Sequence, residues 1–442
     1  CHHCRFLQRA RYCFTVCGGE VMTAPKLRFK EFDGDWKIKK LGNCFNLISG
    51  YAFPSSASVD KGAKWLKIAD VGIQEMTPSS LSYLPHEFLE KYPQFIVSKE
   101  DYVIALTRPI LNKKLKIAKV GSSYDGALLN QRVAKIQTNK NDLGFIYSLL
   151  QKSKTVEELE NSISGTDPPN LSLNDVKDIR LGFPSIEEQT KIATFLSAVD
   201  EKISQLTQKH ELLSQYKQGM MQKLFSQQIR FKADDGSEFG EWKKVKFSDK
   251  FKFHQTNSYS RALLSEQGEI MNIHYGDIHT KFSTLFDISK EVVPFLSSEV
   301  NTNKFAEDQF LQVGDLVIAD ASEDYKDIGK ALEIIHLNNQ KVVAGLHTYI
   351  ARPVHPFALG FCGYLMQTFE VREQIKKLAT GISVLGISKT NIGKVEIKVP
   401  CLKEQTKIAN FLSAIDQKLE IVAQQIEQAK QWKKGLLQQM FV

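Results

Sequence analysis

The chain has 442 residues, of which 42% are hydrophobic and 24% charged, with a mean hydropathy of -0.26. This length exceeds the roughly 250–300 residues that one hydrophobic core usually supports, so two or more domains are expected. No apolar run approaches the ~18 residues that cross a bilayer, which argues against a membrane protein, and the net charge of +8 favours a polyanionic partner.

Residues 1–21 are expected to lie outside the folded domains. They share no pattern with the segments that follow, the chain begins with Cys, and "MTAPKLRFKEF" from Met22 resembles a natural start. We interpret them as a leader or non-native extension. The isolated cysteines elsewhere are typical of a reducing cytoplasm, and no metal site is predicted in the rest of the chain. The alternative for the front segment is a zinc site, with ligands among Cys1, His2, His3, Cys4, Cys13 and Cys17.

Two globular domains of the α+β class are predicted, over residues 22–184 and 229–400. Helical periodicity covers residues 142–153 and 358–379. Short runs rich in β-branched residues predict strands in both domains. These strands are expected at 102–106, 133–137, 178–184, 316–319, 348–353 and 394–400.

Each globular domain is followed by a predicted long helix, over residues 185–228 and 401–442. In both segments apolar residues recur at alternating steps of four and three, the 3.5-residue repeat of a coiled-coil seam. A helix of about 40 residues with one narrow apolar stripe cannot bury that stripe alone, so the two helices are expected to pair. The predicted seam comprises Ile192, Leu196, Val199, Ile203, Leu206, Leu213, Ile408, Leu412, Ile415, Leu419, Val422 and Ile426.

Both helices carry a lysine on the seam, Lys217 and Lys433. Such a lysine either sets the register of the pair, marks where the seam opens, or extends its stem towards solvent. Glu188 and Glu404 lie in the first helical turns, where the helix dipole favours negative charge.

The second half of the chain repeats the first. "EEQTKIATFLSAVDEKI" at 187–203 returns as "KEQTKIANFLSAIDQKL" at 403–419, and "LRFKEFDGDW" at 27–36 resembles "IRFKADDGSEFGEW" at 229–242. Antiparallel pairing of the helices would relate the copies by an approximate two-fold axis and place the domains at opposite ends of a rod of ~60 Å. That length suits two half-sites on one face of a DNA duplex.

The repeated motifs, with "VVAGLHTYIARP" at 342–353 and "KKGLLQQMF" at 433–441, resemble the specificity subunit of bacterial Type I restriction-modification enzymes. The resemblance covers residues 22–442. It implies two target recognition domains, each reading one half of a split site in double-stranded DNA, and two antiparallel helices that set the spacing. It further implies docking of two modification (methyltransferase) subunits, to which restriction (motor-nuclease) subunits add. A non-enzymatic two-headed scaffold or adaptor is the alternative.

No catalytic site is predicted in this chain. Phosphate-cradle and metal-helix motifs are absent from the sequence. "DPPN" at 167–170 approaches the D/N-P-P-Y/F tetrad of adenine methyltransferases, but Asn170 cannot stack on a flipped base, and the second copy has "SVLG" at 383–386. We therefore expect S-adenosylmethionine, ATP and Mg to bind partner subunits, with no cofactor in this one.

Candidate DNA contacts are basic, amide and aromatic residues in loops beside predicted strands, because such groups read base edges and phosphates. Residues 26–184 carry 23 basic and 18 acidic side chains, whereas residues 227–400 carry 21 and 22. The second domain therefore needs a local patch or a partner's cations. The candidates are Arg108, Lys113, Lys114, Lys116, Lys119, Asn130, Gln131 and Arg132, and in the second domain His274, Tyr275, Lys326, His347, Thr348 and Tyr349.

Overall fold

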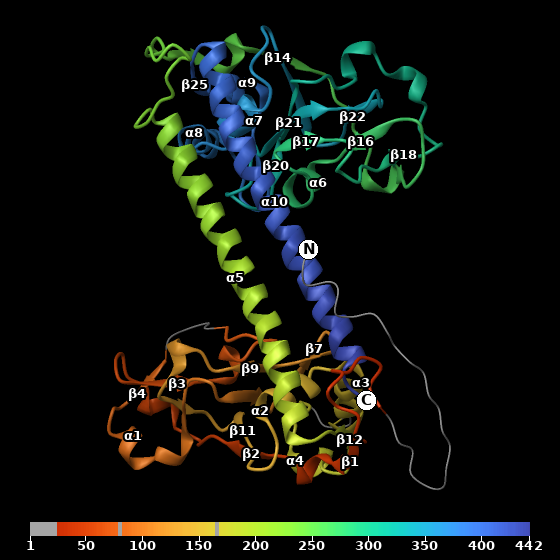
Figure 1. The fold of residues 1–442 in the computed structure, drawn as a ribbon. Helices are drawn as coiled ribbons and strands as arrows, with labels where there is room; N and C mark the ends of the chain where they lie inside the picture. The colour runs from red at the N-terminus through yellow and green to blue at the C-terminus, as the bar shows by residue number, and fades with distance from the viewer. Residues whose placement is uncertain (1–23, 78–81, 164–167) are drawn as a thin grey trace. The chain divides into compact units, whose positions relative to one another are not determined.

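The computed structural model describes residues 24–77, 82–163 and 168–442. Two compact units emerge from the contacts within the chain, and each is described by itself (Figure 1). The first comprises Cys1–Thr207 and Gln424–Val442, and the second comprises Gln208–Ala423. The long helices α5 (Ile186–Phe225) and α10 (Leu402–Gln439) both run from one unit into the other. In the described part of the chain, no helix is long and apolar enough to span a membrane.

The first unit contains two four-stranded sheets. The main sheet is antiparallel and has the order β2 (Asn46–Ser49), β11 (Val133–Gln137), β6 (Tyr102–Ala105), β9 (Ile117–Lys119). The second sheet has the order β4 (Tyr83–Leu84), β3 (Ala63–Leu66), β10 (Ala127–Leu129), β5 (Ile96–Val97). The remaining elements are the pair β1 (Lys37–Lys40) and β12 (Arg180–Phe183), the hairpin β7 (Ile110–Leu111) and β8 (Lys114–Leu115), and helices α1 (Phe88–Lys91), α2 (Leu143–Leu149), α3 (Ser153–Ile163) and α4 (Leu173–Val176).

The second unit repeats this arrangement and extends it. Its main sheet has the order β14 (Phe251–His254), β23 (Thr348–Pro353), β19 (Leu316–Ala319), β21 (Ala331–His336), β17 (Leu285–Asp287). Its second sheet has the order β15 (Leu264–Ser265), β18 (Phe295–Leu296), β16 (Met271–Ile273), β22 (Val342–Ala344). The remaining elements are the pairs β13 (Lys243–Lys246) with β25 (Glu396–Val399) and β20 (Ala321–Ser322) with β24 (Leu385–Gly386), and helices α6 (Tyr275–Thr280), α7 (Phe361–Met366), α8 (Phe369–Leu378) and α9 (Lys389–Gly393).

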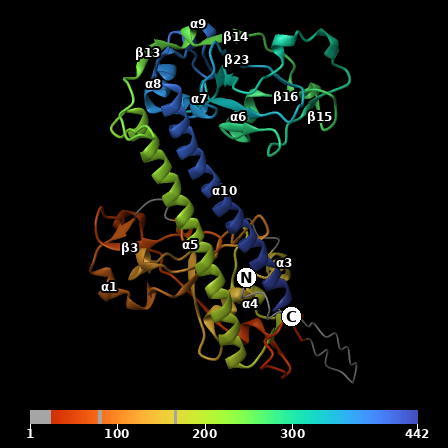
Figure 2. The ribbon, with the colours of Figure 1, turned by 45° about the horizontal axis from the view of Figure 1, so that its top comes forward.

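Strand register establishes which residues correspond between the units. Val133 pairs with Ala105 across β11 and β6, and Thr348 pairs with Ala319 across β23 and β19. In both second sheets, a strand from early in the domain pairs in parallel with a later one, β3 with β10 and β16 with β22. In each unit the second sheet lies on the side away from α10, as both views show (Figures 1 and 2).

The predicted strands are all present, because β-branched runs with regular burial are local signals. The helical pattern predicted over 358–379 is interrupted: α7 ends at Met366 and α8 begins at Phe369. At the interruption Thr368 donates its hydroxyl to the carbonyl of Leu365 at 2.8 Å, which satisfies an acceptor at the end of α7. Two short helices therefore replace one long one.

Within each unit, α5 and α10 run antiparallel. In the first unit Ile192 and Leu196, early in α5, share a core with Leu436 and Met440, late in α10. In the second, Leu224 at the end of α5 packs in one core with residues 408–415 of α10. The seam residues are all buried or half-buried, with exposures up to 8% for Ile192, Leu196, Val199, Leu206, Ile408, Leu412, Ile415 and Val422, and intermediate exposure for Ile203, Leu213, Leu419 and Ile426.

The two seam lysines form ion pairs with the opposite helix. Lys433 Nζ lies 2.6 Å from Asp200 Oδ1 in the first unit, and Lys217 Nζ lies 2.6 Å from Asp416 Oδ1 in the second. The positions of these two pairs are related by the 216-residue repeat. Lys433 is 5% exposed, so its ammonium does not extend to solvent. Of the predicted roles for these lysines, the contacts favour setting the register.

A second repeated contact fixes the start of each long helix. Arg28 donates to both carboxylate oxygens of Glu188 at 2.8 and 2.7 Å, and Trp36 Nε1 donates to the same group at 3.3 Å. Arg230 and Trp242 hold Glu404 in the same way. Glu188 and Glu404 are therefore buried partners of an arginine and a tryptophan, in addition to lying in the first turn. These contacts explain the repeated sequence at the start of each domain.

Candidate nucleic-acid interface

In each unit, the ends of several main-sheet strands meet at one edge. Because β11 is antiparallel to β2 and β6, the start of β11 lies beside the ends of the other two strands. Arg132 precedes β11 and residues 106–108 follow β6. In the second unit the same places are taken by His347, before β23, and Asp320, after β19. We call this edge, with the loops that cover it, the strand-end surface.

In the first unit, an exposed hairpin extends from the strand-end surface. Asn112 and Lys113 connect β7 to β8 with φ angles of 51° and 56°, the two left-handed residues of a type I′ turn. Lys113 at such a position is unfavourable by roughly 1–2 kcal/mol, because its Cβ approaches a carbonyl oxygen. Arg108, before the hairpin, also has a positive φ of 46°, and its amide donates to Pro169 O at 2.8 Å. The side chains of Arg108, Lys113 and Lys114 are exposed, so three cations face solvent together.

Three other candidate DNA contacts of the first unit already have partners within the protein. Lys116 is half-buried and donates to the carbonyl of Ile68 at 3.4 Å, and burial lowers its pKa. Lys119 is paired with Glu100 at 2.5 Å. Asn130 uses its side-chain oxygen to accept from the amide of Arg132 at 3.1 Å, which shapes the turn before β11. Gln131 and Arg132 remain exposed at that turn.

In the second unit, the exposed His347 and the half-buried Tyr275 form the centre of the strand-end surface. His347 has a φ of 55°, its side chain is half exposed, and its Nδ1 lies 3.1 Å from Asp320 Oδ1. The ring of Tyr275 packs edge-on against His347, with 5.3 Å between centroids, and in a tilted arrangement against His274, with 4.6 Å between centroids. A positive φ in a non-glycine residue is strained and is held there by surrounding contacts.

Two predicted contacts of the second unit lie in the interior instead. Thr348 is 1% exposed and donates its hydroxyl to the carbonyl of Gly345 at 2.5 Å. His274 is 6% exposed and caps α6, its Nδ1 accepting from the amide of Gly276 at 3.1 Å. Both side chains therefore stabilise loops and do not face solvent. Lys326 is exposed, and its carbonyl accepts from Arg372 at 2.8 Å.

Tyr349 marks the boundary between the strand-end surface and the edge strand β14. Burial first, and then the neighbouring Asp320, raise its pKa to about 12, so its hydroxyl stays protonated. Lys389 Nζ lies 5.1 Å from the centre of its ring and donates to the carbonyl of His254 at 3.5 Å. Lys389 was not among the predicted contacts, because its position depends on the distant start of α9.

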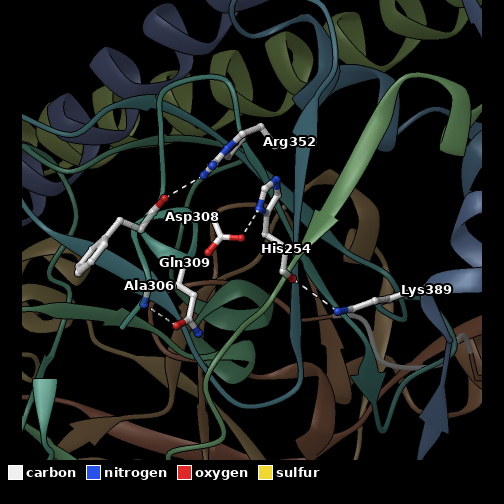
Figure 3. Close-up of polar contacts among 8 residues, drawn as sticks. His254, Ala306, Asp308, Gln309, Arg352 and Lys389 are labelled. Atoms are coloured by element: carbon white, nitrogen blue, oxygen red, sulfur yellow. Dashed lines mark hydrogen bonds and ion pairs between the residues drawn. The ribbon is translucent and has the colours of Figure 1, made fainter. Parts of the chain in front are cut away.

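A polar network attaches the loop at residues 306–310 to the edge strand β14 and its neighbour β23 (Figure 3). The side chain of His254 meets Asp308, with 3.1 Å between Nδ1 and Oδ2. Arg352 donates to the carbonyl of Phe310 at 2.8 Å and to the buried carboxylate of Asp315 at 2.8 and 2.7 Å. These contacts hold the loop in place. The carboxylate of Asp308 and the carbonyl of Phe310 therefore have partners within the protein.

Two buried aspartates were also missed. Asp70 and Asp277, 2% and 1% exposed, follow β3 and β16 at corresponding places. The sequence contains a weak sign of this correspondence. "LKIAD" at 66–70 aligns with "IHYGD" at 273–277, but the aspartate is the one residue that the two segments share. Asp70 accepts from the amide of Lys67 at 2.8 Å, whereas Asp277 faces Arg261 and Lys281, each at 3.1 Å. One position thus has different surroundings in the two units.

The motif at 167–170 takes part in chain pairing. Asp167 lies outside the described residues. Asn170 pairs with Thr107 in an antiparallel bridge and accepts from the Thr107 hydroxyl at 2.7 Å. The corresponding place in the second unit is the pair β20–β24. The cysteines of the possible zinc site also lie outside the described residues, and the rest of the chain that the structure describes has no group of three metal-ligating side chains arranged around one point.

Comparison with known proteins finds specificity subunits of Type I restriction enzymes among the relatives of this chain. The chain is 32% identical over 221 residues to the MjaVIII specificity subunit of a Type I restriction enzyme from Methanocaldococcus jannaschii, a match covering 50% of this chain and 52% of that protein. It thus spans about half the length of that relative. A putative specificity subunit from the same organism, MjaX, is 24% identical over 93% of this chain and 94% of its own.

Among solved structures, the S subunit of a Type I restriction-modification system from M. genitalium has a TM-score of 0.58 at 15% identity, covering 95% of this chain and 99% of that one. This likeness shows a common fold. The family model described as the Type I restriction modification DNA specificity domain matches twice, at residues 33–215 and 240–431. These two matches include most of the chain and both repeats, and the chain therefore belongs to the Type I restriction-modification DNA specificity domain family.

Proposed function

We propose that this chain is the DNA sequence-specificity subunit of a Type I restriction-modification complex. Each unit reads one half of a bipartite site in double-stranded DNA, and the paired helices set the distance between the halves. The observation that carries this proposal is the strand-end surface, which recurs on the same framework with different side chains. Arg132 of the first unit corresponds to His347 of the second, so one position of this surface carries different side chains in the two units. A repeated framework with divergent loops suits an asymmetric site. The comparisons do not favour the scaffold alternative.

The distribution of cations at the strand-end surface suggests that the two units bind DNA phosphates differently. In the first, Arg108, Lys113 and Lys114 are exposed together and suit contact with DNA phosphates. The second domain has no net positive charge, since residues 227–400 carry 21 basic and 22 acidic side chains. Its half-site therefore depends on a few placed side chains and on cations of a partner subunit.

Two modification subunits are the expected partners on the helices, and restriction subunits join them. Exposed aromatic residues recur at matching places: Tyr216 is 50% exposed, and Trp432, 216 positions later, is 47% exposed. Trp432 packs edge-on against Phe195, with 5.9 Å between centroids. Aromatic side chains are frequent anchors of protein interfaces, and a repeated pair suits two copies of one partner.

Chemistry is assigned to those partners, so this chain acts without catalysis and holds no cofactor. Asn170 is engaged with Thr107 and cannot stack on an extruded base. S-adenosylmethionine, ATP and Mg would therefore bind the modification and restriction subunits. The complex would work in the cytoplasm, where host DNA is available.

A domain exchange tests the proposal. Residues 229–400 are replaced by the corresponding domain of a relative, and the chain is combined with its modification subunit. Because each unit has its own strand-end surface, methylated adenines mapped across a genome should show one half of the recognised sequence changed and the other retained. Replacing residues 26–184 is the matched control and should change the opposite half. Alteration of both halves by either exchange would refute independent reading.

A further inference from the structure

Arg261 is fastened to the surface of the second unit by two buried groups. It begins the 3-10 helix Arg261–Leu263 and its side chain is 52% exposed. Its Nη2 lies 3.1 Å from Asp277 Oδ1 and 3.3 Å from His274 Nδ1. Within the described part of the chain, Nε and Nη1 donate to no protein acceptor. Nη2 is thus bound on the protein side, and Nε and Nη1 remain available as two separate donors.

Buried groups of the second unit fix the position of the Arg261 guanidinium. Asp277 is a buried carboxylate, and a buried charge is tolerated only beside cations or hydrogen-bond donors. Both of its cations, Arg261 and Lys281, have side chains more than half exposed. A Cβ on Gly276 would lie 3.1 Å from Arg261 Nη2, so the glycine leaves room for the guanidinium. Arg261 is therefore placed by the core and keeps its outer side towards solvent.

His274 acts as the second support. Burial first, and then the charge of Arg261, lower the pKa of His274, which keeps the imidazole neutral. Its Nδ1 accepts from the amide of Gly276 and faces Arg261. A neutral imidazole with Nδ1 as the acceptor attracts a guanidinium, whereas an imidazolium would repel it.

Arg261 adjoins the strand-end surface. The ring of His274 packs against Tyr275, and Tyr275 packs against His347. A chain of contacts through His274 and Tyr275 therefore connects the guanidinium to His347 at that surface. A fixed arginine loses less conformational freedom on binding than a mobile one, which favours a geometric contact over a diffuse charge.

The first unit has no counterpart of this arginine. Asp70 occupies the place of Asp277, but its carboxylate accepts from the backbone amide of Lys67. The short helix Ser55–Ala57 takes the place of Arg261–Leu263. A feature that serves the shared fold would be expected in both units, whereas a feature that reads DNA should differ between them.

We propose that Arg261 reads a guanine in the half-site of the second unit, donating through Nη1 to O6 or N7 in the major groove. Guanine presents two acceptors, O6 and N7, on its major-groove edge. The inference rests on the proposed function and adds to it a base and the residue that selects it.

The test compares Arg261→Lys and Arg261→Ala with the parent chain, each assembled with the modification subunit. Methylation is measured on DNA carrying the parent site with one half or the other randomised. Both variants should lose about 10- to 100-fold of the preference for guanine at one position of the second unit's half-site, with all other positions unchanged. Lys244→Ala removes an exposed cation of the same unit, away from this surface, and should lower methylation evenly or not at all.

Arg261→Lys keeps a cation beside Asp277, so it guards against a variant that fails to fold. Unchanged base preference in Arg261→Lys and Arg261→Ala would overturn the assignment, and so would relaxation spread over both half-sites. A parent complex that methylates without preference for a bipartite site would overturn the proposed function itself, which separates the two failures.

Discussion

Glu333 shows how one residue couples the stability of the second unit to pH. Its carboxyl group is 1% exposed and accepts from the amides of Gly360 and Gly363 at 2.8 and 2.6 Å, at the start of α7. Burial raises its pKa to about 7, and the amides lower it only in part. A carboxyl group whose pKa is raised on folding stabilises the fold below its unfolded pKa, near 4.5, and loses that contribution as pH rises through 7.

We therefore expect the parent chain to lose about 3 kcal/mol of stability, relative to Glu333→Gln, between pH 4.5 and pH 8. The glutamine cannot ionise and keeps one acceptor for the α7 amides. Urea unfolding of both chains at several pH values measures the difference. The exposed Glu299→Gln serves as the control and should follow the parent profile. Parallel profiles for the parent and Glu333→Gln would contradict an ionisation at Glu333.

At the scale of elements, the antiparallel order of α5 and α10 is encoded by apolar packing and by one charged pair in each unit. The seam supplies most of the burial, yet a stripe of Leu, Ile and Val tolerates a shift by one heptad. A lysine that must meet an aspartate does not tolerate such a shift, because the buried ammonium of Lys433 would then lose Asp200 as its partner. Lys433 also donates to Gln74 and Gln151, at 3.1 and 3.2 Å, so its ammonium is bound on three sides.

Charge reversal tests this pairing. Asp200→Lys places two cations together beside a largely buried ammonium and should lower the stability of the first unit by about 2–4 kcal/mol. Combining it with Lys433→Asp restores opposite charges and should recover most of the loss. The same exchange at the exposed pair Lys191 and Glu31, 3.4 Å apart, should cost less than about 1 kcal/mol at each step. A double mutant no more stable than Asp200→Lys would show that the pair does not set the register.

The elements could be predicted from sequence where their signal is local. The seam repeats every 3.5 residues and the strands are β-branched runs, so both long helices and all six predicted strands are present. The break between α7 and α8 was missed, because periodicity alone does not register the change of direction at Thr368. The partners of Glu188 and Lys433 were also missed, because they lie 160 and 233 residues away, at Arg28 and Asp200.

The candidate site was harder to predict, for a physical reason. Polar residues in loops have no periodicity that distinguishes a surface group from a buried cap. His274 and Thr348 proved internal, whereas Arg261, which no pattern marked, is held outward by a carboxylate 16 positions away. The residues of recognition loops are selected for the ligand that they bind and not for the fold. Their sequence therefore carries little information about their own structure.

At the scale of the whole molecule, the duplication separates two tasks. The parts that repeat closely are the long helices and the contacts that anchor them, such as Arg28 with Glu188 and Arg230 with Glu404. The parts that diverge are the second sheets and the strand-end loops. If the repeated parts hold partners and set spacing while the divergent parts read bases, then spacing and sequence preference should be separable by mutation.

Lengthening the helices tests that separation. Inserting seven residues after Thr207 in α5 and seven after Ala423 in α10 adds one heptad to each and keeps the seam in register. Seven helical residues extend each helix by about 10.5 Å, close to three base-pair steps. Methylation mapping should then show both half-sites unchanged and the spacer lengthened by about three base pairs.

Inserting seven residues into α5 alone is the matched control. The extra turns have no partner in α10, so the seam falls out of register and assembly with the modification subunit should weaken. A lengthened pair that still recognises the original spacer would mean that the helices do not measure the distance, and the spacing would then have to come from the partner subunits. Changed half-sites with an unchanged spacer would show that the strand-end loops depend on the helices, which contradicts the separation of the two tasks.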